Sequence, residues 1–440
     1  MKRLFENTLE KWKNSGMEKP LMVIGVRQIG KTYTLNKFCK ENFEDYLYFN
    51  IEKTDWIREI FENTLDASKI LSNIELKLER KIDLEKTIFF FDEIQVSERA
   101  ITSLKYFCES EKPFKIVCAG SLLGIKINRF NSSFPVGKIK MEYMYPMNYE
   151  EFLMAIGKEM LLDRIKYCYS NMESMQDFAH EEAIDLYRKY LCLGGMPESI
   201  NDFILNNQDI LQYDSKILSN IVEMYIADMN KYTFSNIESV KIEKIYKNIP
   251  TQLANENKRF KYSVLEKSAK KRKFETAIDW LIASNMVLAC YNVKRPEKPL
   301  KVFHDKDVFK LYLSDIGILT NISEVKFSDI LLNQSFMYKG SITENYIAQE
   351  LTAKSVSLYY WTSEREAEVD FLIYNNDGII PVEIKASDNS LSKSLNYYSD
   401  KYKPKYSIRI STKNFVFENN IKSIPLYSVF CMANEINAKV

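Results

Sequence analysis

The stretch Gly25–Thr32 reads GVRQIGKT, and it decides how the first part of the chain folds. It fits the pattern GxxxxGK[ST], a loop that binds phosphate groups. The apolar residues Leu21–Ile24 before it predict a buried strand, and Lys31–Lys40 predicts the start of a helix. A strand, a glycine-flanked loop and a helix in this order aim backbone N–H groups and a helix N-terminus at an anion. We therefore expect this segment to bind a nucleotide, with ATP as the ligand.

Each position of the loop has an expected role. Gly25 and Gly30 carry no Cβ, which permits a tight loop and a close approach of the backbone to phosphate. Lys31 is expected to reach the β- and γ-phosphates, and the Thr32 hydroxyl is expected to hold Mg²⁺. The residues predicted to bind the nucleotide are Gly25, Arg27, Gln28, Ile29, Gly30, Lys31, Thr32 and Tyr33.

A second motif downstream supports the first. Thr87–Glu93 reads TIFFFDE, an apolar run that ends in two acidic residues. A strand inside a parallel sheet is apolar on both faces, and open α/β sheets bind ligands at the C-terminal ends of their strands. We expect Asp92 to join the Mg²⁺ shell and Glu93 to polarise the attacking water. The alternative, a Gly-rich turn and a solvated acidic pair, requires both motifs to occur in order by coincidence.

The composition limits the class of protein. At 440 residues the chain has room for about two or three domains. Its net charge of +1 confines any nucleic-acid surface to a local patch. The 7 cysteines form no CxxC pair and only His180 and His304 are present, so we expect no structural zinc site and a reduced, cytoplasmic location. No apolar run approaches the roughly 18 residues of a membrane span, so we expect no membrane contact.

Seven stretches are relevant to the family of the chain. They are GVRQIGKT, FFFDEIQ (Phe89–Gln95), AGSLL (Ala119–Leu123), FPVGKIKMEYMYPMNYEEFL (Phe134–Leu153), LGGMPES, KLYLSDIGIL and GSITENYIAQEL. Together they resemble AAA-class ATPases of bacteria and archaea that carry a fused C-terminal domain of uncharacterised function. The resemblance spans most of the chain and implies an AAA-type parallel sheet, ATP hydrolysis and assembly into a homo-oligomer.

The resemblance also bears on two catalytic positions. In ATPases of this strand order, a polar residue at the tip of the strand predicted at Phe114–Ala119 contacts the γ-phosphate, and Ser121 is the candidate; a plain Gly-Ser turn is the alternative. Relatives often carry Gly-Arg where this chain has Gly137-Lys138. In such ATPases an arginine stabilises the transition state, and a lysine ammonium cannot reproduce the planar, two-pronged hydrogen bonding of its guanidinium. Arg27 and Arg129 are the possible substitutes for this role.

The middle of the chain, from about Met160 to Ile330, is expected to be mostly helical. The segment 258–273 is strongly basic, with a single acid at Glu266. A helix at Phe274–Ser284 and two strand-like runs, Met286–Val293 and Leu300–Phe303, would follow in the order of a winged-helix module. This order favours a DNA-binding surface on the basic segment, and a solvated lysine face without a ligand is the alternative.

The C-terminal part contains a strong hairpin signal. Glu368–Tyr374 and Ile379–Lys385 alternate in polarity and flank the turn Asn375–Gly378. A two-residue loop at Asn376-Asp377 would place Asp370 opposite Glu383, whereas a loop at Asp377-Gly378 would place it opposite Lys385. Because side chains alternate along a strand, both registers put these polar residues on one face, together with Glu368.

Two carboxylates and an amine on one sheet face can support metal chemistry. Asp370 and Glu383 are predicted to bind Mg²⁺, with Lys385 orienting a water or the phosphate charge. The D…ExK pattern resembles the PD-(D/E)xK restriction-endonuclease-like fold, which implies Glu344, on a predicted helix, as a further metal ligand. An exposed sheet face with ordinary Glu–Lys pairs is the alternative.

The sequence therefore predicts a multidomain α/β protein. Its parts are a P-loop, AAA-type domain at 1–160, a helical and winged-helix domain at 161–335, and a PD-(D/E)xK nuclease-like domain at 336–440. The function expected is a Mg²⁺-dependent ATPase that binds DNA and acts on it as a nuclease. The alternative is a nucleotide-dependent switch that binds DNA or protein without cleaving it.

Overall fold

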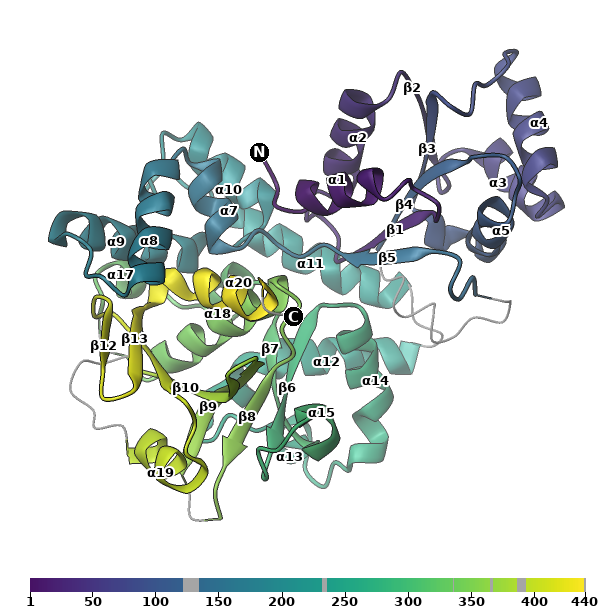
Figure 1. The fold of residues 1–440 in the computed structure, drawn as a ribbon. Helices are drawn as coiled ribbons and strands as arrows, with labels where there is room; N and C mark the ends of the chain where they lie inside the picture. The colour runs from purple at the N-terminus through teal and green to yellow at the C-terminus, as the bar shows by residue number, and fades with distance from the viewer. Residues whose placement is uncertain (122–133, 232–235, 335, 365–366, 386–392, 439–440) are drawn as a thin grey trace. The chain divides into compact units, whose positions relative to one another are not determined.

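The structure is a computed structural model of residues 1–440 that describes all but 122–133, 232–235, 335, 365–366, 386–392 and 439–440 (Figure 1). It separates into two compact units. The first comprises Met1–Tyr145 with Ala283–Asn285, and the second comprises Pro146–Ile282 with Met286–Val440.

The first unit is built on a parallel sheet of five strands. Their order is β2-β3-β4-β1-β5, and every neighbouring pair is parallel. The strands are β1 (Leu21–Ile24), β2 (Asp45–Asn50), β3 (Thr87–Asp92), β4 (Lys115–Gly120) and β5 (Lys140–Tyr143). The helices are α1 (Glu6–Asn14), α2 (Lys31–Asn42), α3 (Asp55–Asn63), α4 (Ala67–Leu78) and α5 (Glu98–Cys108). This arrangement confirms the predicted parallel sheet.

An aromatic cluster fills the core on one side of this sheet. Phe91 of β3 packs with ring centroids 5.3 Å from Phe61 of α3 and 6.3 Å from Phe107 of α5. The Phe107 ring centroid lies 4.8 Å from that of Phe114, the residue just before β4. Burial of these rings fixes α3 and α5 against the sheet, and aromatic pairs at such separations add to the hydrophobic term. All residues of β3 are buried, so the apolar sequence TIFFFD is explained by burial on both faces of the sheet.

The second unit combines a helical layer with a mixed sheet of eight strands. The helices before the sheet are α7 (Tyr149–Ala155), α8 (Glu159–Asn171), α9 (Asp177–Leu193), α10 (Pro197–Leu205), α11 (Lys216–Lys231), α12 (Asn236–Leu253), α13 (Tyr262–Leu265) and α14 (Lys271–Ala283). The sheet order is β12-β13-β11-β10-β9-β8-β6-β7. Its strands are β6 (Val287–Val293), β7 (His304–Leu313), β8 (Tyr359–Thr362), β9 (Glu368–Asn375), β10 (Gly378–Ile384), β11 (Ser407–Ser411), β12 (Val416–Glu418) and β13 (Ile421–Pro425). The helices α15 (Leu300–Phe303), α16 (Ile316–Ile322), α17 (Phe327–Leu331), α18 (Lys339–Ala353), α19 (Lys393–Tyr402) and α20 (Val429–Ala438) complete it.

The expected two-stranded ribbon differs from the prediction in one strand. Leu300–Phe303 is not a strand but the short helix α15, preceded by Pro299 at its N-cap. Proline has no N–H to give to a strand ladder and a φ suited to the start of a helix, which explains the error. The second strand of the ribbon is β7, antiparallel to β6.

The ribbon also joins a larger sheet. β6 pairs in parallel with β8, with Tyr291 opposite Tyr359, so one sheet takes strands from both sides of residue 336. The two segments divided at 336 therefore share one compact unit. The winged-helix assignment of the segment before 336 stays a prediction.

The hairpin register agrees with the first of the two predicted alternatives. Gly378 lies opposite Asn375 and Val382 opposite Phe371, so the loop is Asn376-Asp377. Continuing this register places Asp370 opposite Glu383. The Ile384 N–H donates to Asp370 Oδ2 at 2.7 Å, which ties the two strands together at the polar end.

The glycines of LGGMPES have a structural use. A Cβ on Gly195 would overlap the Met147 carbonyl, and one on Gly194 would overlap Gly317 and Asp315. The buried Asp315 carboxylate accepts the Gly195 N–H at 2.6 Å and caps α16 by accepting the Ile318 N–H at 3.1 Å. The two motifs that contain these residues therefore hold each other in place.

Glu350 of α18 is a buried acid that makes folding depend on pH. It is 0% exposed, and one oxygen accepts the Tyr149 N–H at 2.7 Å. Its Oε2 is buried without a hydrogen-bond partner in the described structure. Burial raises the pKa of Glu350 from 4.5 to about 8, an effect opposed by the Tyr149 N–H and Lys354 and reinforced by nearby acids.

We expect Glu350→Gln to flatten the pH dependence of stability. Between pH 4.5 and 8 the unfolded chain ionises this carboxyl and the folded chain does not, so the free energy of unfolding falls by about 1.4 kcal/mol per pH unit from this group. An amide does not titrate. Urea unfolding of both proteins at pH 5 to 8 measures the difference, and parallel curves would show that Glu350 ionises as freely in the folded state as in the unfolded state.

Candidate functional site

The loop after β1 has the backbone of a phosphate-binding turn. Gly30 has φ +86° and Gln28 has φ +65°, left-handed values that turn the chain sharply into α2. A Cβ on Gly25 would overlap the Met144 carbonyl oxygen. Glycine is therefore required at position 25 by close backbone approach and favoured at position 30 by φ.

Lys31 is the cation of this loop. Its side chain is 8% exposed, and Nζ donates to the carbonyls of Gly25 at 2.9 Å and Val26 at 2.7 Å. Burial lowers the pKa of Lys31 to about 8, and the charges of Glu93 and Asp92 oppose that shift. The ammonium therefore lies within the loop, held by carbonyls that a phosphate oxygen can replace as partner.

Thr32 and Asp92 meet across the edge of the sheet. Thr32 Oγ1 donates to Asp92 Oδ2 at 3.0 Å, and the Tyr48 hydroxyl of β2 donates to the same oxygen at 3.0 Å. Burial raises the pKa of Asp92, which is 4% exposed. A hydroxyl and a carboxylate so placed are the oxygen ligands that Mg²⁺ prefers, and they fit the predicted metal position.

A third group of side chains surrounds Glu93. Gln95 donates through Nε2 to Glu93 Oε2 and to Ser121 Oγ, the latter at 3.3 Å, and Arg27 Nε also donates to Ser121 Oγ at 3.3 Å. Strand β4 lies between β3 and β1, which brings Ser121 between the acidic pair and the loop. The structure thus places Glu93, Ser121 and Arg27 together, as one network.

Two residues of this site had no assigned role in the sequence. Gln95 is 1% exposed and links Glu93 to Ser121. The sequence feature that could have identified it is its position two residues after Glu93, just past the end of the apolar strand. Arg3 is 5% exposed and donates to the carbonyls of Ile29 at 2.6 Å and Tyr145 at 2.7 Å. No local sequence pattern predicts that Arg3 contacts Ile29, which lies 26 residues later in the chain.

The remaining predicted positions differ in their placement. Ile29 is 0% exposed and supports the loop from inside, whereas Tyr33 is 62% exposed on α2. Lys138 pairs with Glu109 Oε1 at 3.0 Å on the surface of the same unit. Arg129 lies outside the described residues.

A second polar cluster forms on the sheet of the second unit. Glu344 of α18 is 3% exposed; its Oε1 is paired with Lys258, and its Oε2 accepts from Lys310 at 3.3 Å and from the Tyr312 hydroxyl at 2.9 Å. Lys310 also pairs with Glu368 at 2.6 Å. The lysine charges outweigh the effect of burial and lower the pKa of Glu344 to about 2.

The hairpin residues complete this cluster. Burial, with the Glu344 charge second, raises the pKa of Asp370 to about 7. Lys385 Nζ lies 3.1 Å from Glu383 Oε1, and Glu383 Oε2 is buried without a hydrogen-bond partner in the described part of the chain. Over the described residues, no three His, Cys, Asp or Glu side chains are grouped so that they could hold a metal ion. Lys258, Lys310 and Tyr312 were not predicted for this site, because each is distant in sequence from the hairpin.

The basic segment 258–273 is partly neutralised. Lys271 pairs with Asp307 at 2.5 Å and Lys273 with Glu266 at 2.7 Å, whereas Lys258 is committed to Glu344. Four basic side chains of the segment are exposed and have no ion pair in the described structure: Lys261, Lys267, Lys270 and Arg272. They form the part of the predicted DNA surface that is free to meet phosphate.

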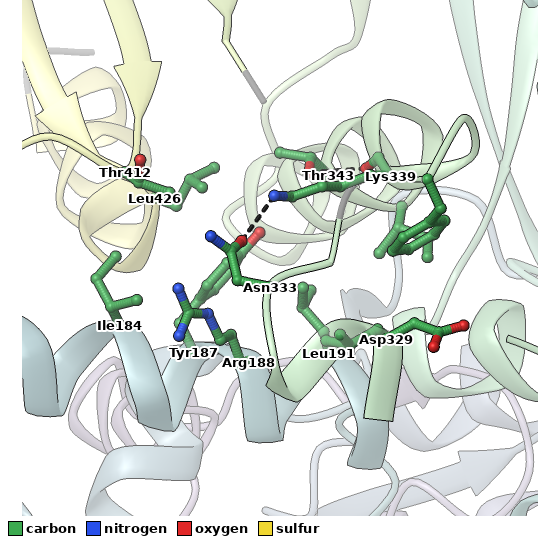
Figure 2. Close-up of a pocket in the computed structure, with 13 residues that line it drawn as sticks. Ile184, Tyr187, Arg188, Leu191, Asp329, Asn333, Lys339, Thr343, Thr412 and Leu426 are labelled. Atoms are coloured by element: carbon green, nitrogen blue, oxygen red, sulfur yellow. Dashed lines mark hydrogen bonds between the residues drawn. The ribbon is translucent and has the colours of Figure 1, made fainter. Parts of the chain in front are cut away.

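A small pocket elsewhere in the second unit is not a nucleotide site. Figure 2 shows the pocket beside α9, with Tyr187 and Arg188 among its lining residues and with Lys339 and Asn333 joined by a 2.7 Å hydrogen bond. Its volume of about 30 Å³ suits molecules the size of water.

Across the described ranges, no helix is both long and apolar enough to cross a membrane.

Three family matches cover separate parts of the chain. Residues 17–153 match a family described as an AAA domain, whereas 184–329 and 339–429 each match a domain of unknown function, DUF8612 and DUF4143 respectively. The gap between the last two falls near the predicted division at 335/336. None of the curated proteins compared with the chain matches it.

Solved structures with partial similarity include archaeal ATPases. A Walker-type ATPase of Pyrococcus abyssi matches with 13% identity and a TM-score of 0.43, over 72% of this chain and 93% of that one. The Aeropyrum pernix ORC2 protein, in its ADPNP-ADP complexes, matches with 12% identity and a TM-score of 0.40, over 78% and 94%. The family match and the loop geometry together identify the N-terminal part of the chain as a P-loop ATPase domain of the AAA type.

Proposed function

We propose that the chain hydrolyses ATP with Mg²⁺ at the N-terminal site and uses the cycle to act on DNA. The observation that carries the ATPase proposal is the convergence of three groups at one edge of one parallel sheet: Lys31 in the loop, Thr32 with Asp92, and Glu93 with Gln95 and Ser121. Nucleotide, metal and water each have a matching set of side chains there.

The chain's own residues account for the steps. Lys31 exchanges its carbonyl partners for oxygens of the β- and γ-phosphates. Mg²⁺, bound by Thr32 and Asp92, would supply positive charge to the phosphate oxygens. Glu93, oriented by Gln95, accepts a hydrogen bond from the attacking water, and Ser121 and Arg27 contact the γ-phosphate. Phosphate release from ATP with and without Mg²⁺ tests this assignment, and release unaffected by chelation of the metal would contradict it.

DNA binding is proposed on the exposed basic residues Lys261, Lys267, Lys270 and Arg272. When basic side chains contact the phosphate backbone, counterions leave the DNA. Binding to a DNA duplex should therefore weaken as the salt concentration rises. This property does not distinguish a nuclease from a switch that leaves DNA intact.

A nuclease-like second site is proposed on the hairpin. The supporting observations are the register that sets Asp370 opposite Glu383 and the buried, unpartnered oxygen of Glu383 in the described structure, an acceptor suited to a metal ion. Asp370 and Glu383 would hold Mg²⁺ there, and Lys385 would contact the phosphate. The non-cleaving switch remains the second candidate, because a fold can outlast its chemistry.

We expect plasmid nicking in the presence of Mg²⁺ and ATP to be lost in Lys385→Ala. The substitution removes the ammonium that would steady charge on the phosphate, and a loss of about 100-fold or more in rate is expected. Agarose gels measure the nicked fraction. Lys405→Ala, which removes an exposed lysine paired with Asp377 at the hairpin turn, is the matched control and should nick as the wild type does. Absence of nicking in the wild type would favour the switch.

A further inference from the structure

Arg3 holds the phosphate-binding loop from outside the motif. Its side chain is 5% exposed, and the guanidinium donates through Nη1 to the Ile29 carbonyl at 2.6 Å and through Nη2 to the Tyr145 carbonyl at 2.7 Å. Ile29 is the last residue of the loop before Gly30, and Tyr145 lies just after β5, the strand that pairs with β1. One buried side chain therefore ties the end of the loop to the chain that follows the neighbouring strand.

The hydrogen bond to Ile29 fixes the orientation of one peptide group. The peptide between Ile29 and Gly30 is trans, so its carbonyl and its N–H point in opposite directions. Because the Ile29 carbonyl points at Arg3, the Gly30 N–H points away from Arg3. In a loop of this kind the backbone N–H groups bind phosphate oxygens. Arg3 thus keeps the carbonyl on its own side and leaves the N–H to face an anion on the other.

Glycine at position 30 makes this peptide easy to turn over unless it is held. Gly30 has φ +86°, and glycine adopts positive and negative φ with similar ease. The peptide group before it can therefore rotate at little steric cost. Rotation would present the Ile29 carbonyl oxygen to a phosphate, and two groups with negative charge repel each other. The hydrogen bond from Arg3 opposes this rotation.

Lys31 cannot hold the loop in the same way once nucleotide is bound. Its ammonium donates to the carbonyls of Gly25 at 2.9 Å and Val26 at 2.7 Å. When the ammonium turns to the phosphates, these two carbonyls lose that donor. The partners of Arg3 are the carbonyls of Ile29 and Tyr145, which the nucleotide does not replace. Arg3 is therefore the cation that continues to hold the loop backbone after Lys31 has moved.

We propose that Arg3 is a positioning residue of the ATPase site, which fixes the peptide between Ile29 and Gly30 so that its N–H meets the β-phosphate. The inference rests on the nucleotide site proposed above. Gly30 directly precedes Lys31, whose ammonium is assigned to the β- and γ-phosphates, so the β-phosphate is the group within reach. ADP and ATP share this phosphate, and the contact is the same before and during hydrolysis. Arg3 should therefore affect nucleotide affinity and not the rate of the chemical step.

The test compares ADP affinity, measured by calorimetry on the full-length protein, with kcat for ATP hydrolysis at saturating ATP. Arg3→Met keeps an unbranched side chain but removes both donors, so we expect ADP to bind about tenfold more weakly while kcat stays close to that of the wild type. The matched control is Lys37→Met. Lys37 is a cation of α2 that contacts the same N-terminal segment, pairing with Glu6 at 3.2 Å, and its removal should leave ADP affinity unchanged.

Arg3→Lys is the second variant. A single ammonium cannot span two carbonyls as the planar guanidinium does, so ADP should bind about threefold more weakly than to the wild type. This variant decides the question if Arg3→Met does not fold. Failure of Arg3→Lys to fold as well would make Arg3 a residue of the fold and would overturn the proposal.

The remaining outcomes separate this inference from the nucleotide site itself. Wild-type ADP affinity in a folded Arg3→Met protein refutes the positioning role and leaves the nucleotide site intact. A fall in kcat as large as the fall in affinity also refutes it, because loss of a contact shared by the bound and reacting states does not slow the chemical step. If the wild type binds no ADP, the nucleotide site fails, and the role of Arg3 fails with it.

Discussion

Lys31→Ala should weaken ATP binding by about 100-fold. The ammonium is buried within the loop, and it would make charge-assisted bonds to two phosphates. Two such bonds contribute roughly 3 kcal/mol, and each 1.4 kcal/mol corresponds to about a factor of ten in affinity. Titration with a fluorescent ATP analogue measures the change.

Lys40→Ala is the matched control for that result. Lys40 is an exposed lysine in the last turn of the same helix, so its removal changes the net charge of α2 equally without touching the loop. Alanine at 31 also leaves the Gly25 and Val26 carbonyls without their donor, and thermal unfolding of both variants separates a loss of stability from a loss of affinity. Equal ATP affinity in Lys31→Ala and Lys40→Ala would rule out the loop as the triphosphate site.

Glu93→Gln should slow ATP turnover by about 100-fold or more while leaving ATP affinity close to that of the wild type. Glu93 follows the buried end of β3 with φ +51°, and Gln95 donates to its carboxylate. An amide of the same shape fills the position but cannot take a proton from the attacking water. Phosphate release under saturating ATP and an independent binding titration together measure the two effects.

The control for Glu93→Gln is the same change at an exposed acid of the same unit, Glu111→Gln, which should turn over ATP normally. If Glu93→Gln still hydrolyses ATP, another group must position the attacking water. Gln95, which donates to the Glu93 carboxylate, is the first candidate. A simultaneous loss of ATP binding would instead show that Glu93 holds the nucleotide or the fold.

The N-terminal site was largely predictable because its signals are local. The loop, the strand TIFFFD and the position of Ser121 each follow from a short run of residues whose backbone geometry is fixed by glycine, apolar periodicity or a strand end. Arg3 was missed because its partners, the carbonyls of Ile29 and Tyr145, give no sequence signal. Tyr33 lies one residue past the motif, in the first turn of α2, and its side chain faces outward.

The second site shows where local reasoning fails. The turn and the alternation of polarity left two hairpin registers open, and the structure has the first of them. Lys385 was predicted with the hairpin, but Lys258 and Lys310 were not, because they lie 86 and 34 residues before Glu344 and meet it only through the tertiary fold. From a single sequence, a lysine on an exposed basic segment cannot be told from a lysine that forms a buried ion pair.

The parallel pairing of β6 with β8 has a consequence for how this protein can change over time. The segments before and after residue 336 share a sheet, and Glu344 and Lys310, one from each segment, share an ion pair. Exchanging either segment for its counterpart from a distant relative would disturb the pairing of β6 with β8 at Tyr291 and Asn292 and leave an ionised side chain buried without its partner. We therefore expect the segments before and after residue 336 to change together in evolution.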